Sequence, residues 1–502
     1  MGEAKRQVKR LDGPVRQVRR PESFKSGGPA DIPVNPAIPP VVDQEAGGGV
    51  VLPAQTSRPK SKFRAAFTKK RLLAATSLSV VCVFAFVGVK AVLATKRVIQ
   101  KSSERAAPAL SGPVDPTKLK GEGDGRINIL LLGTGGSGHD GGNLSDTIMV
   151  ASIDPKAKTI AMLSIPRDMY VRIPGYGYSK INAANAYGGP DLAKQVVSKI
   201  LDLPIHYYVQ ADFSGFKQAV DAVGGVDINN KEKLYDSAYP CDNDRGFCPF
   251  SLPVGQYHMD GKLALKFARC RHGLCGNDFG RAARQQQLLV ALRQKALEAS
   301  TLTNPVKIGG LIDSVGSHAK TDLQLKELEK LAVIVKDLDT SKTQQKVLDM
   351  TPAGLLVDGS SQFPGAGSIE IPRAGAFNYS EIQALAHTIF VDGYLKQEAA
   401  AIEIQNGTTK VGMAAAVTKQ LQAYSYNVVA TLSAPTNDHQ ASTIIDYSGG
   451  KKPYTLQYLE KRFGIKAGKA VKPTTLSAGE TQIPDIVVII GANYKLPIPT
   501  TP

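Results

Sequence analysis

The pattern of apolar and polar segments between residues 127 and 168 predicts a small sheet with charged residues at one edge. Three short apolar runs, residues 127–132, 147–153 and 159–165, are separated by a glycine-rich loop and by a turn at Asp154. Short apolar runs bounded by turn residues are typical of buried strands. If the last two runs form an antiparallel hairpin, the residue before the first and the residues after the second meet at one edge.

The residues at that edge can bind an anion together with a metal ion. Asp146 precedes the second run, Arg167 and Asp168 follow the third, and the loop of residues 133–143 enters the same edge. Carboxylates, an arginine and glycine-rich backbone suit a metal-bound anionic ligand. A plainer interpretation, with Asp146 as a strand cap and Arg167-Asp168 as a surface pair, stays open on these residues alone.

The rest of the chain alternates strand and helix patterns, which predicts an α/β (α-β-α-like sandwich) domain followed by a smaller α/β C-terminal domain. In the larger domain the expected segments are helix 191–201, strand 206–209, helix 213–223 and strand 226–228. In the C-terminal domain they are strand 401–405, helix 411–424 and strands 427–432, 443–447 and 486–490. The C-terminal domain lacks clustered carboxylates and a nucleophile, so we expect a binding module there.

A second polar patch, residues 267–287, carries four arginines. Arg269 and Arg271 alternate, so on an extended segment both point to one face. Three further residues follow Asp278 at positions i, i+3 and i+4, which places them on one side of a helix: Arg281, Arg284 and Gln285. Arginine binds phosphate oxygens in pairs and stays charged, so the set suits a polyphosphate; a basic solvated face is the alternative.

Charge and hydropathy indicate a membrane anchor. The net charge is +17, and residues 1–71 are basic and rich in proline and glycine, typical of a disordered cytoplasmic tail. Residues 72–94 are long and apolar enough for one transmembrane helix. The positive excess before this segment predicts that the chain after residue 95 lies outside the cell membrane. No nucleic-acid partner is expected, because the basic tail contains no folded reader of bases.

Four cysteines in the expected extracytoplasmic part favour disulfides. They occur as CDNDRGFC and CRHGLC, and pairing within each motif and pairing across the two are both allowed by the sequence. Neither spacing is that of a zinc knuckle.

Several ordered motifs resemble the LytR-CpsA-Psr family: LLLGTGG, LSDTIMVASID, SIPRD, KINAANAYGG, DFSGFKQAVDAVGGV and DFGRAARQQQ. Residues from about 400 to 495 resemble the LytR-type C-terminal domain that often follows. This resemblance implies a phosphotransferase domain at 127–398 with its motif core at 127–300 and a C-terminal domain at 399–495. The composition of the flanking segments predicts a linker at 95–126 and a tail at 496–502.

The resemblance also implies an activity and its site. Such proteins are membrane-anchored phosphotransferases that move a glycopolymer from a polyprenyl-pyrophosphate carrier to peptidoglycan, with Mg²⁺ or Mn²⁺; a pyrophosphatase side activity and wall-assembly partner proteins would be consistent with this. Asp146 would bind the metal. The catalytic set would be Arg167, Arg269, Arg271 and Asp278. The pyrophosphate would be bound by the same arginines, together with Arg281, Arg284 and Gln285.

Two positions depart from the family pattern. Thr134 stands where the family usually has an aspartate, and Leu144 stands where it usually has an arginine. The first change removes a metal ligand, and we expect Asp140 to replace it, with His139 as a second candidate. These departures support an alternative function: a non-catalytic protein of the same fold that binds wall polymer or polyprenyl phosphate.

Overall fold

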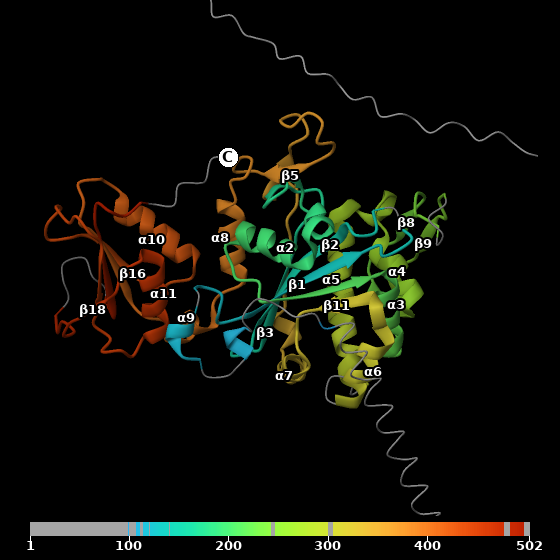
Figure 1. Ribbon diagram of the computed structural model, residues 1–502, viewed down its shortest axis with the longest axis horizontal. Helices are drawn as coiled ribbons and strands as arrows, with labels where there is room; N and C mark the ends of the chain where they lie inside the picture. Colours follow the sequence, from blue (N-terminus) through green and yellow to red (C-terminus); the bar gives the residue numbers. More distant parts are fainter. Residues whose placement is uncertain are drawn as a thin grey trace, which may run out of the picture. The chain divides into compact units, whose positions relative to one another are not determined.

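The structure, a computed structural model, describes residue 99 and seven further segments (Figure 1): 107–110, 114–119, 121–139, 141–241, 246–299, 305–475 and 482–495. The expected cytoplasmic tail and the expected membrane span at 72–94 lie outside these residues. Among the helices that the structure describes, none combines the length and the apolar character needed to cross a membrane.

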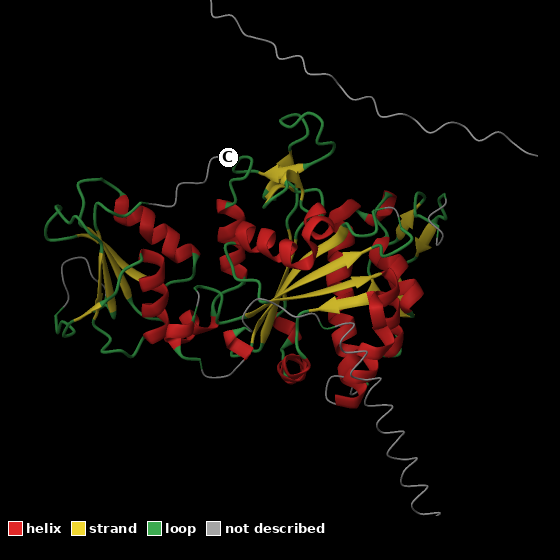
Figure 2. Ribbon diagram, viewed as in Figure 1, coloured by secondary structure: helices red, strands yellow, loops and turns green. Residues whose placement is uncertain are grey.

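A mixed six-stranded sheet forms the centre of the larger domain (Figure 2). Its strands, in spatial order, are β11 (Ala319–Thr321), β6 (Tyr207–Asp212), β1 (Ile127–Thr134), β2 (Ser145–Asp154), β3 (Thr159–Ser164) and β12 (Gln344–Val347). β1, β2 and β3 are antiparallel neighbours, whereas β6 is parallel to β1 and β12 is parallel to β3. The expected hairpin between the second and third apolar runs is therefore confirmed.

Helices cover both faces of this sheet, which explains why its strands are apolar runs and do not alternate. On one face, Leu130, Val150 and Leu163 pack with α2 (Ala183–Leu201) and α8 (Ser380–Ile389). On the other face, the strand side chains pack with α5 (Asn277–Glu298) and α7 (Leu325–Lys336): Ile127, Ile129, Met149, Ile153 and Met162. The expected α/β domain is confirmed as a mixed sheet between helices.

Helix α2 begins earlier than the helix that the sequence pattern predicted at residues 191–201. α2 starts at Ala183, but its backbone is not helical at Gly188 and Gly189, where Gly189 has φ 69°. A left-handed conformation of this kind is easy only for glycine. Pro190 then restarts the helix, since proline fits a first turn in which its missing N–H is not needed. The apolar stripe begins only after this break, so the pattern marked the second half of α2 alone.

The remaining elements of the larger domain surround the sheet. The helices are α3 (Phe213–Ala222), α4 (Gly261–Arg269) and α6 (Pro305–Val315), whereas α9 (Gly393–Glu398) packs in the core of the C-terminal domain through Tyr394 and Leu395. Two-stranded pairs are β4 (Tyr170–Ile173) with β5 (Gly177–Lys180), β7 (Val226–Asn230) with β10 (Gly255–Met259), β8 (Leu234–Asp236) with β9 (Phe250–Leu252), and β13 (Leu356–Asp358) with β14 (Glu370–Pro372). Short 3-10 helices lie at Pro108–Leu110, Pro116–Lys118, Gly273–Cys275, Gly316–His318 and Thr340–Lys342.

The C-terminal domain is a smaller α/β unit, as expected. Its five-stranded sheet has the order β16 (Val428–Ser433), β15 (Ile402–Asn406), β19 (Ile486–Ile490), β17 (Thr443–Asp446) and β18 (Gly468–Lys469). Its helices are α10 (Met413–Ala423) and α11 (Pro453–Phe463), and buried Tyr458 and Leu459 anchor α11 in the core. The sequence analysis did not identify α11, because its apolar stripe is only about two turns long.

Candidate active site

An apolar cavity of about 280 Å³ lies between the central sheet and helices α3, α4 and α5. Its apolar walls include Leu131, Met149, Val209, Phe213, Phe216, Leu265, Leu288 and Leu289. The same cavity is lined by a group of polar and charged side chains: Thr134, Asp146, Arg167, Asp212, Arg269, Arg271, Arg281 and Gln285. A ligand that fits both parts must carry a hydrocarbon chain and a strongly anionic group.

Arg167 lies at the sheet edge where the hairpin geometry predicted it. Its Nη1 donates to Asp146 Oδ1 at 2.5 Å. Its Nε lies 3.4 Å from Asp168 Oδ2 and 4.0 Å from Asp278 Oδ2, yet it is buried and makes no hydrogen bond to any described residue. Burial lowers the pKa of Arg167, but the charges of Asp146, Asp168 and Asp278 outweigh it and raise the pKa. Arg167 is therefore permanently charged, and its Nε–H can still donate a hydrogen bond to a ligand.

Helix α5 adds a second cation beside Arg167. Arg281 Nη1 lies 2.7 Å from Asp278 Oδ1, and its Nη2 donates to the carbonyl oxygen of Asp146 at 3.1 Å. Arg271 Nη1 reaches the same Asp278 oxygen at 3.8 Å. Asp278 stands in the first turn of α5, where the helix dipole also favours negative charge. With Asp168 and its partner Lys180 included, four cations (Arg167, Arg271, Arg281 and Lys180) face three aspartates (Asp146, Asp168 and Asp278), which leaves one positive charge for an added phosphate.

The prediction that Arg269 and Arg271 share an extended segment is wrong. Arg269 is the last residue of α4, a helix that Asp260 caps by accepting from the Leu263 amide. The helix forms because Ala264 and Phe267 are buried along one face. The Arg269 guanidinium lies 4.2 Å from the centre of the Phe213 ring. Both arginines nevertheless line the cavity, one from the helix end and one from the turn that follows.

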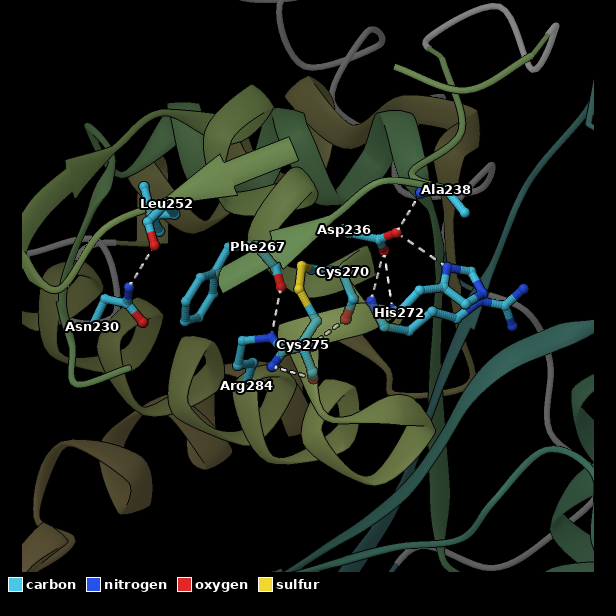
Figure 3. Close-up of a disulfide and its surroundings, with 10 residues drawn as sticks. Asn230, Asp236, Ala238, Leu252, Phe267, Cys270, His272, Cys275 and Arg284 are labelled. Atoms are coloured by element: carbon cyan, nitrogen blue, oxygen red, sulfur yellow. Dashed lines mark hydrogen bonds and ion pairs between the residues drawn. A yellow bond between two sulfur atoms is a disulfide. The ribbon is translucent and has the colours of Figure 1, made fainter. Parts of the chain in front are cut away.

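Arg284 does not line the cavity but donates to three backbone carbonyls around the Cys270–Cys275 disulfide (Figure 3). Its Nε donates to the Phe267 carbonyl at 3.1 Å, its Nη1 to the Cys275 carbonyl at 2.8 Å, and its Nη2 to the Cys270 carbonyl. Burial lowers its pKa to about 10, so it remains charged at neutral pH. The structure thus places Arg284 under the loop that carries Arg271 and outside the cavity lining.

Two disulfides form within the motifs, Cys241–Cys248 and Cys270–Cys275. The second joins the residue between Arg269 and Arg271 to the turn before α5 (Figure 3). Asp236 accepts from the Arg271 and His272 amides at 3.0 and 3.1 Å. Within the described segments, one group of three potential metal-ligating side chains lies close together: Asp236, Cys270 and Cys275. Because the sulfurs are bonded to each other, they offer no thiolate.

The two departures from the family pattern have different surroundings. Thr134 is buried, lines the cavity and pairs with Asp212 of the neighbouring strand β6. Asp212 lines the cavity too, while it caps α3 and accepts from His318 Nδ1 at 2.8 Å. Leu144 packs against the main core. Asp140 lies outside the described residues, and the ring of His139 packs against Phe213 with centroids 5.1 Å apart.

Sequence reasoning missed Asp212, Lys180 and Glu370. Asp212 ends a strand parallel to β1, a position where ligand-binding residues gather in α/β sheets, and this signal was readable. Lys180 ends β5 and donates to Asp168 at 2.7 Å. Glu370 begins β14, and its amide donates to the Asp168 carbonyl at 3.1 Å. The last two depend on long-range contacts and had no local signal.

The polar residues fit one divalent cation. The Asp146 side chain is 37% exposed and lines the cavity, so its carboxylate is accessible. Magnesium takes one or two carboxylates together with phosphate oxygens and water. The Asp146 carboxylate therefore fits the role of a protein ligand to such an ion.

We expect Glu370→Gln to change the pH dependence of stability. One Glu370 oxygen is buried without a partner in the described structure; burial, then the charges of Asp168 and Asp278, raise its pKa to about 7. The native state thus holds the proton more tightly than the unfolded state, so this contribution to stability is lost as pH rises from about 4.5 to about 7. Relative to wild type, the variant should gain about 1–3 kcal/mol between pH 5 and pH 8 in urea unfolding. Exposed Glu232→Gln is the control; equal effects at both pH values would contradict the expectation.

Comparison with known proteins identifies the family. Residues 89–369 match the LytR_cpsA_psr family, and residues 399–494 match the domain described as LytR cell envelope-related transcriptional attenuator. The first match covers more than half of the chain, so the chain belongs to the LytR-CpsA-Psr family.

Similar proteins include two that are named polyisoprenyl-teichoic acid–peptidoglycan teichoic acid transferase TagU. The protein of Oceanobacillus iheyensis is 40% identical over 211 residues, 41% of this chain and 61% of its own length. That of Enterococcus faecalis is 33% identical over 238 residues, 47% of this chain and 73% of its own. The crystal structure of B. subtilis TagV covers 54% of this chain and 98% of its own, with 28% identity and a TM-score of 0.43. The chain thus spans about three fifths of the Oceanobacillus protein.

Proposed function

We propose that this protein transfers a glycopolymer from a polyprenyl-pyrophosphate carrier to peptidoglycan at the outer face of the cell membrane. One observation carries the proposal: the apolar cavity is lined at the same time by Arg167, Arg269, Arg271 and Arg281. Hydrocarbon walls suit the polyprenyl chain, and the arginines suit the pyrophosphate. The names of the TagU relatives describe the same class of reaction for those proteins.

The proposal assigns the remaining parts of the chain. Residues 72–94 anchor it in the membrane, with residues 1–71 in the cytoplasm and residues from about 95 onward outside. The domain at 127–398 performs the transfer, and the domain at 399–495 binds wall polymer or a wall-assembly protein. A membrane anchor suits this reaction, because the carrier's polyprenyl chain is itself held in the bilayer.

The mechanism follows from the positions of the charged side chains. Arg167 and Arg281 bind the pyrophosphate next to Asp146, and Arg269 and Arg271 approach from the turn after α4. An acceptor hydroxyl of peptidoglycan attacks the phosphorus nearest the glycan. The new P–O bond forms while the pyrophosphate bridge breaks, and polyprenyl phosphate leaves. Asp146 would hold a magnesium ion, which when bound would neutralise charge on the phosphate oxygens.

Asp168 and Asp278 are the two carboxylates placed to accept the proton of the attacking hydroxyl. Asp278 is held in place between Arg271 and Arg281, whose Nη1 atoms lie 3.8 and 2.7 Å from its Oδ1. Asp168 forms ion pairs with Lys180 and with Arg167. The arginines favour the reaction because negative charge grows on the leaving phosphate in the transition state.

The test uses the full-length protein in detergent with a polyprenyl-pyrophosphate-linked glycan and a peptidoglycan acceptor. We expect transfer with Mg²⁺, and a loss of at least about tenfold with EDTA or in Asp146→Asn. Exposed Asp313→Asn is the matched control and should transfer at the wild-type rate.

The outcome separates the enzyme from a binding protein. Metal-dependent transfer that Asp146→Asn lowers supports the enzyme. Carrier binding without transfer would overturn it in favour of the non-catalytic function, which the buried Thr134 at a carboxylate position favours. Absence of both binding and transfer would overturn the site itself.

A further inference from the structure

A second hollow lies on the other side of Arg167. This groove, of about 960 Å³, is more than three times the volume of the apolar cavity. Its lining comes from β4, β5, the start of α2 and the loop between β13 and β14, and includes Arg167, Asp168, Tyr170, Tyr178, Lys180 and Phe363. Arg167 lines both hollows, so a ligand held by this arginine can extend into each of them.

Aromatic rings from two distant segments build one wall of the groove. The β4–β5 hairpin lies beside the loop before β14 (Figure 1), and Tyr170 contacts Phe363 with ring centroids 4.9 Å apart. Phe377 contacts Tyr178 at 4.7 Å and Phe363 at 5.8 Å, which ties the hairpin to this loop. The cluster is thus held together by ring packing.

The aromatic wall is accessible. Tyr178 is 44% exposed and Tyr187 is 46% exposed, although both are large rings that sheet and helix positions usually bury. Tyr187 is fixed by stacking on Tyr176, with centroids 4.8 Å apart and planes at 17°. Exposed aromatic rings that are held rigidly beside a charged site are typical of binding surfaces, since little conformational freedom is lost on contact.

The polar side chains of the groove indicate what kind of ligand lies on the rings. Lys180, Asp168 and Gln362 line the same groove with donors and acceptors. Lys180 and Asp168 pair with each other at 2.7 Å, and a hydrocarbon chain would remove water from this charged pair and from Gln362 without offering a hydrogen bond, which is unfavourable. A sugar ring matches both features, because its C–H face packs on an aromatic ring while its hydroxyls and acetamido groups form hydrogen bonds at the edge.

We propose that this aromatic groove binds the sugars of the donor glycan nearest to the pyrophosphate. The assignment rests on the proposed function, which places the pyrophosphate at Arg167. From there the polyprenyl chain occupies the apolar cavity on one side. The first sugar is joined covalently to the phosphate, so it must leave Arg167 by another path, and the groove begins at this arginine. The donor therefore spans both hollows, and the groove contributes selectivity for the polymer's first sugars.

Binding of three probes to the full-length protein in detergent tests the proposal. The probes are a bare polyprenyl pyrophosphate, the same carrier with an N-acetylhexosamine disaccharide, and a soluble peptidoglycan glycan fragment. Wild type should bind the disaccharide-linked carrier about tenfold more tightly than the bare carrier. Tyr178→Ala and Phe363→Ala should bind the bare carrier as wild type does and should lose about five- to tenfold of affinity for the disaccharide-linked one.

Two controls define the role of the ring. Tyr178→Phe keeps the ring and should keep the affinity. Tyr235→Ala removes a tyrosine of equal exposure, 43%, which lines neither hollow, and should bind all three probes as wild type does.

Each other result overturns the assignment in a recognisable way. Unchanged binding of the disaccharide-linked carrier in both alanine variants would exclude the groove as its site. Equal loss of the bare and the sugar-bearing carrier would show that the rings do not select for sugar. Loss confined to the peptidoglycan fragment would make the groove an acceptor site. Failure of wild type to bind the bare carrier would overturn the proposed function itself.

Discussion

Arg167→Ala is expected to lower the rate of glycopolymer transfer by about 10²–10³-fold, the usual cost of removing one donor that stabilises transition-state charge. Arg167 contacts Asp146 at 2.5 Å and has a buried Nε without a hydrogen-bond partner in the described structure. It is therefore positioned to stabilise the negative charge that develops on the pyrophosphate. Since this charge is greatest in the transition state, kcat should fall more than the affinity for the carrier.

The matched control for this prediction is Arg172→Ala. Arg172 lies on β4, five residues along the chain, but its side chain is exposed and lines neither the cavity nor the groove. Its removal should leave kcat at the wild-type value. Steady-state kinetics over a range of carrier concentrations separates the two parameters. A rise in KM with unchanged kcat in Arg167→Ala would assign this arginine to ground-state binding only.

Arg284→Ala is expected to destabilise the folded protein by about 3 kcal/mol. The guanidinium donates to the carbonyls of Phe267, Cys270 and Cys275 at a buried position. Its removal leaves buried acceptors without donors, and hydrogen bonds to charged groups are among the stronger ones. The loss should appear as a lower midpoint in urea unfolding with an unchanged m-value. Arg284→Lys should recover part of the stability, since one ammonium cannot reach all three carbonyls.

Comparison with Arg281→Ala separates structural from ligand-binding roles on the same helix. Arg281 lines the cavity, whereas Arg284 does not. We therefore expect Arg281→Ala to lower the free energy of polyprenyl-pyrophosphate binding by more than it lowers the free energy of unfolding. Folded Arg284→Ala, at low temperature, should keep most of its carrier affinity. The reverse pattern would mean that Arg284 binds phosphate, as its spacing in the sequence suggested.

The difference between these two arginines shows why the sequence could not assign them. Arg281, Arg284 and Gln285 follow one another on one side of a helix, and a helical pattern treats them alike. What separates them is the chain beneath α5: the end of α4 and the Cys270–Cys275 turn present three carbonyls to Arg284. This arrangement depends on residues that are 9 to 17 positions away in the chain.

Local patterns were sufficient where both partners of a contact are close in sequence. The apolar runs before and after Asp154 are joined by a short turn, so their pairing and the meeting of Asp146 with Arg167 followed from strand geometry. The buried stripe in the second half of α2 follows equally local rules. Short-range periodicity reports burial, because each residue position along a strand or helix determines the face on which it lies.

The sequence by itself thus determined the mixed α/β architecture, the sheet edge that carries Asp146 and Arg167, and the family motifs around them. Only the tertiary structure decided which charged residues line the cavity, that Asp212 stands beside Thr134, and that rings from residues 170–187 and 363–377 form one groove. The physical reason is that these contacts join segments far apart in the chain. Their formation depends on how helices pack on both faces of the sheet, which no local pattern encodes.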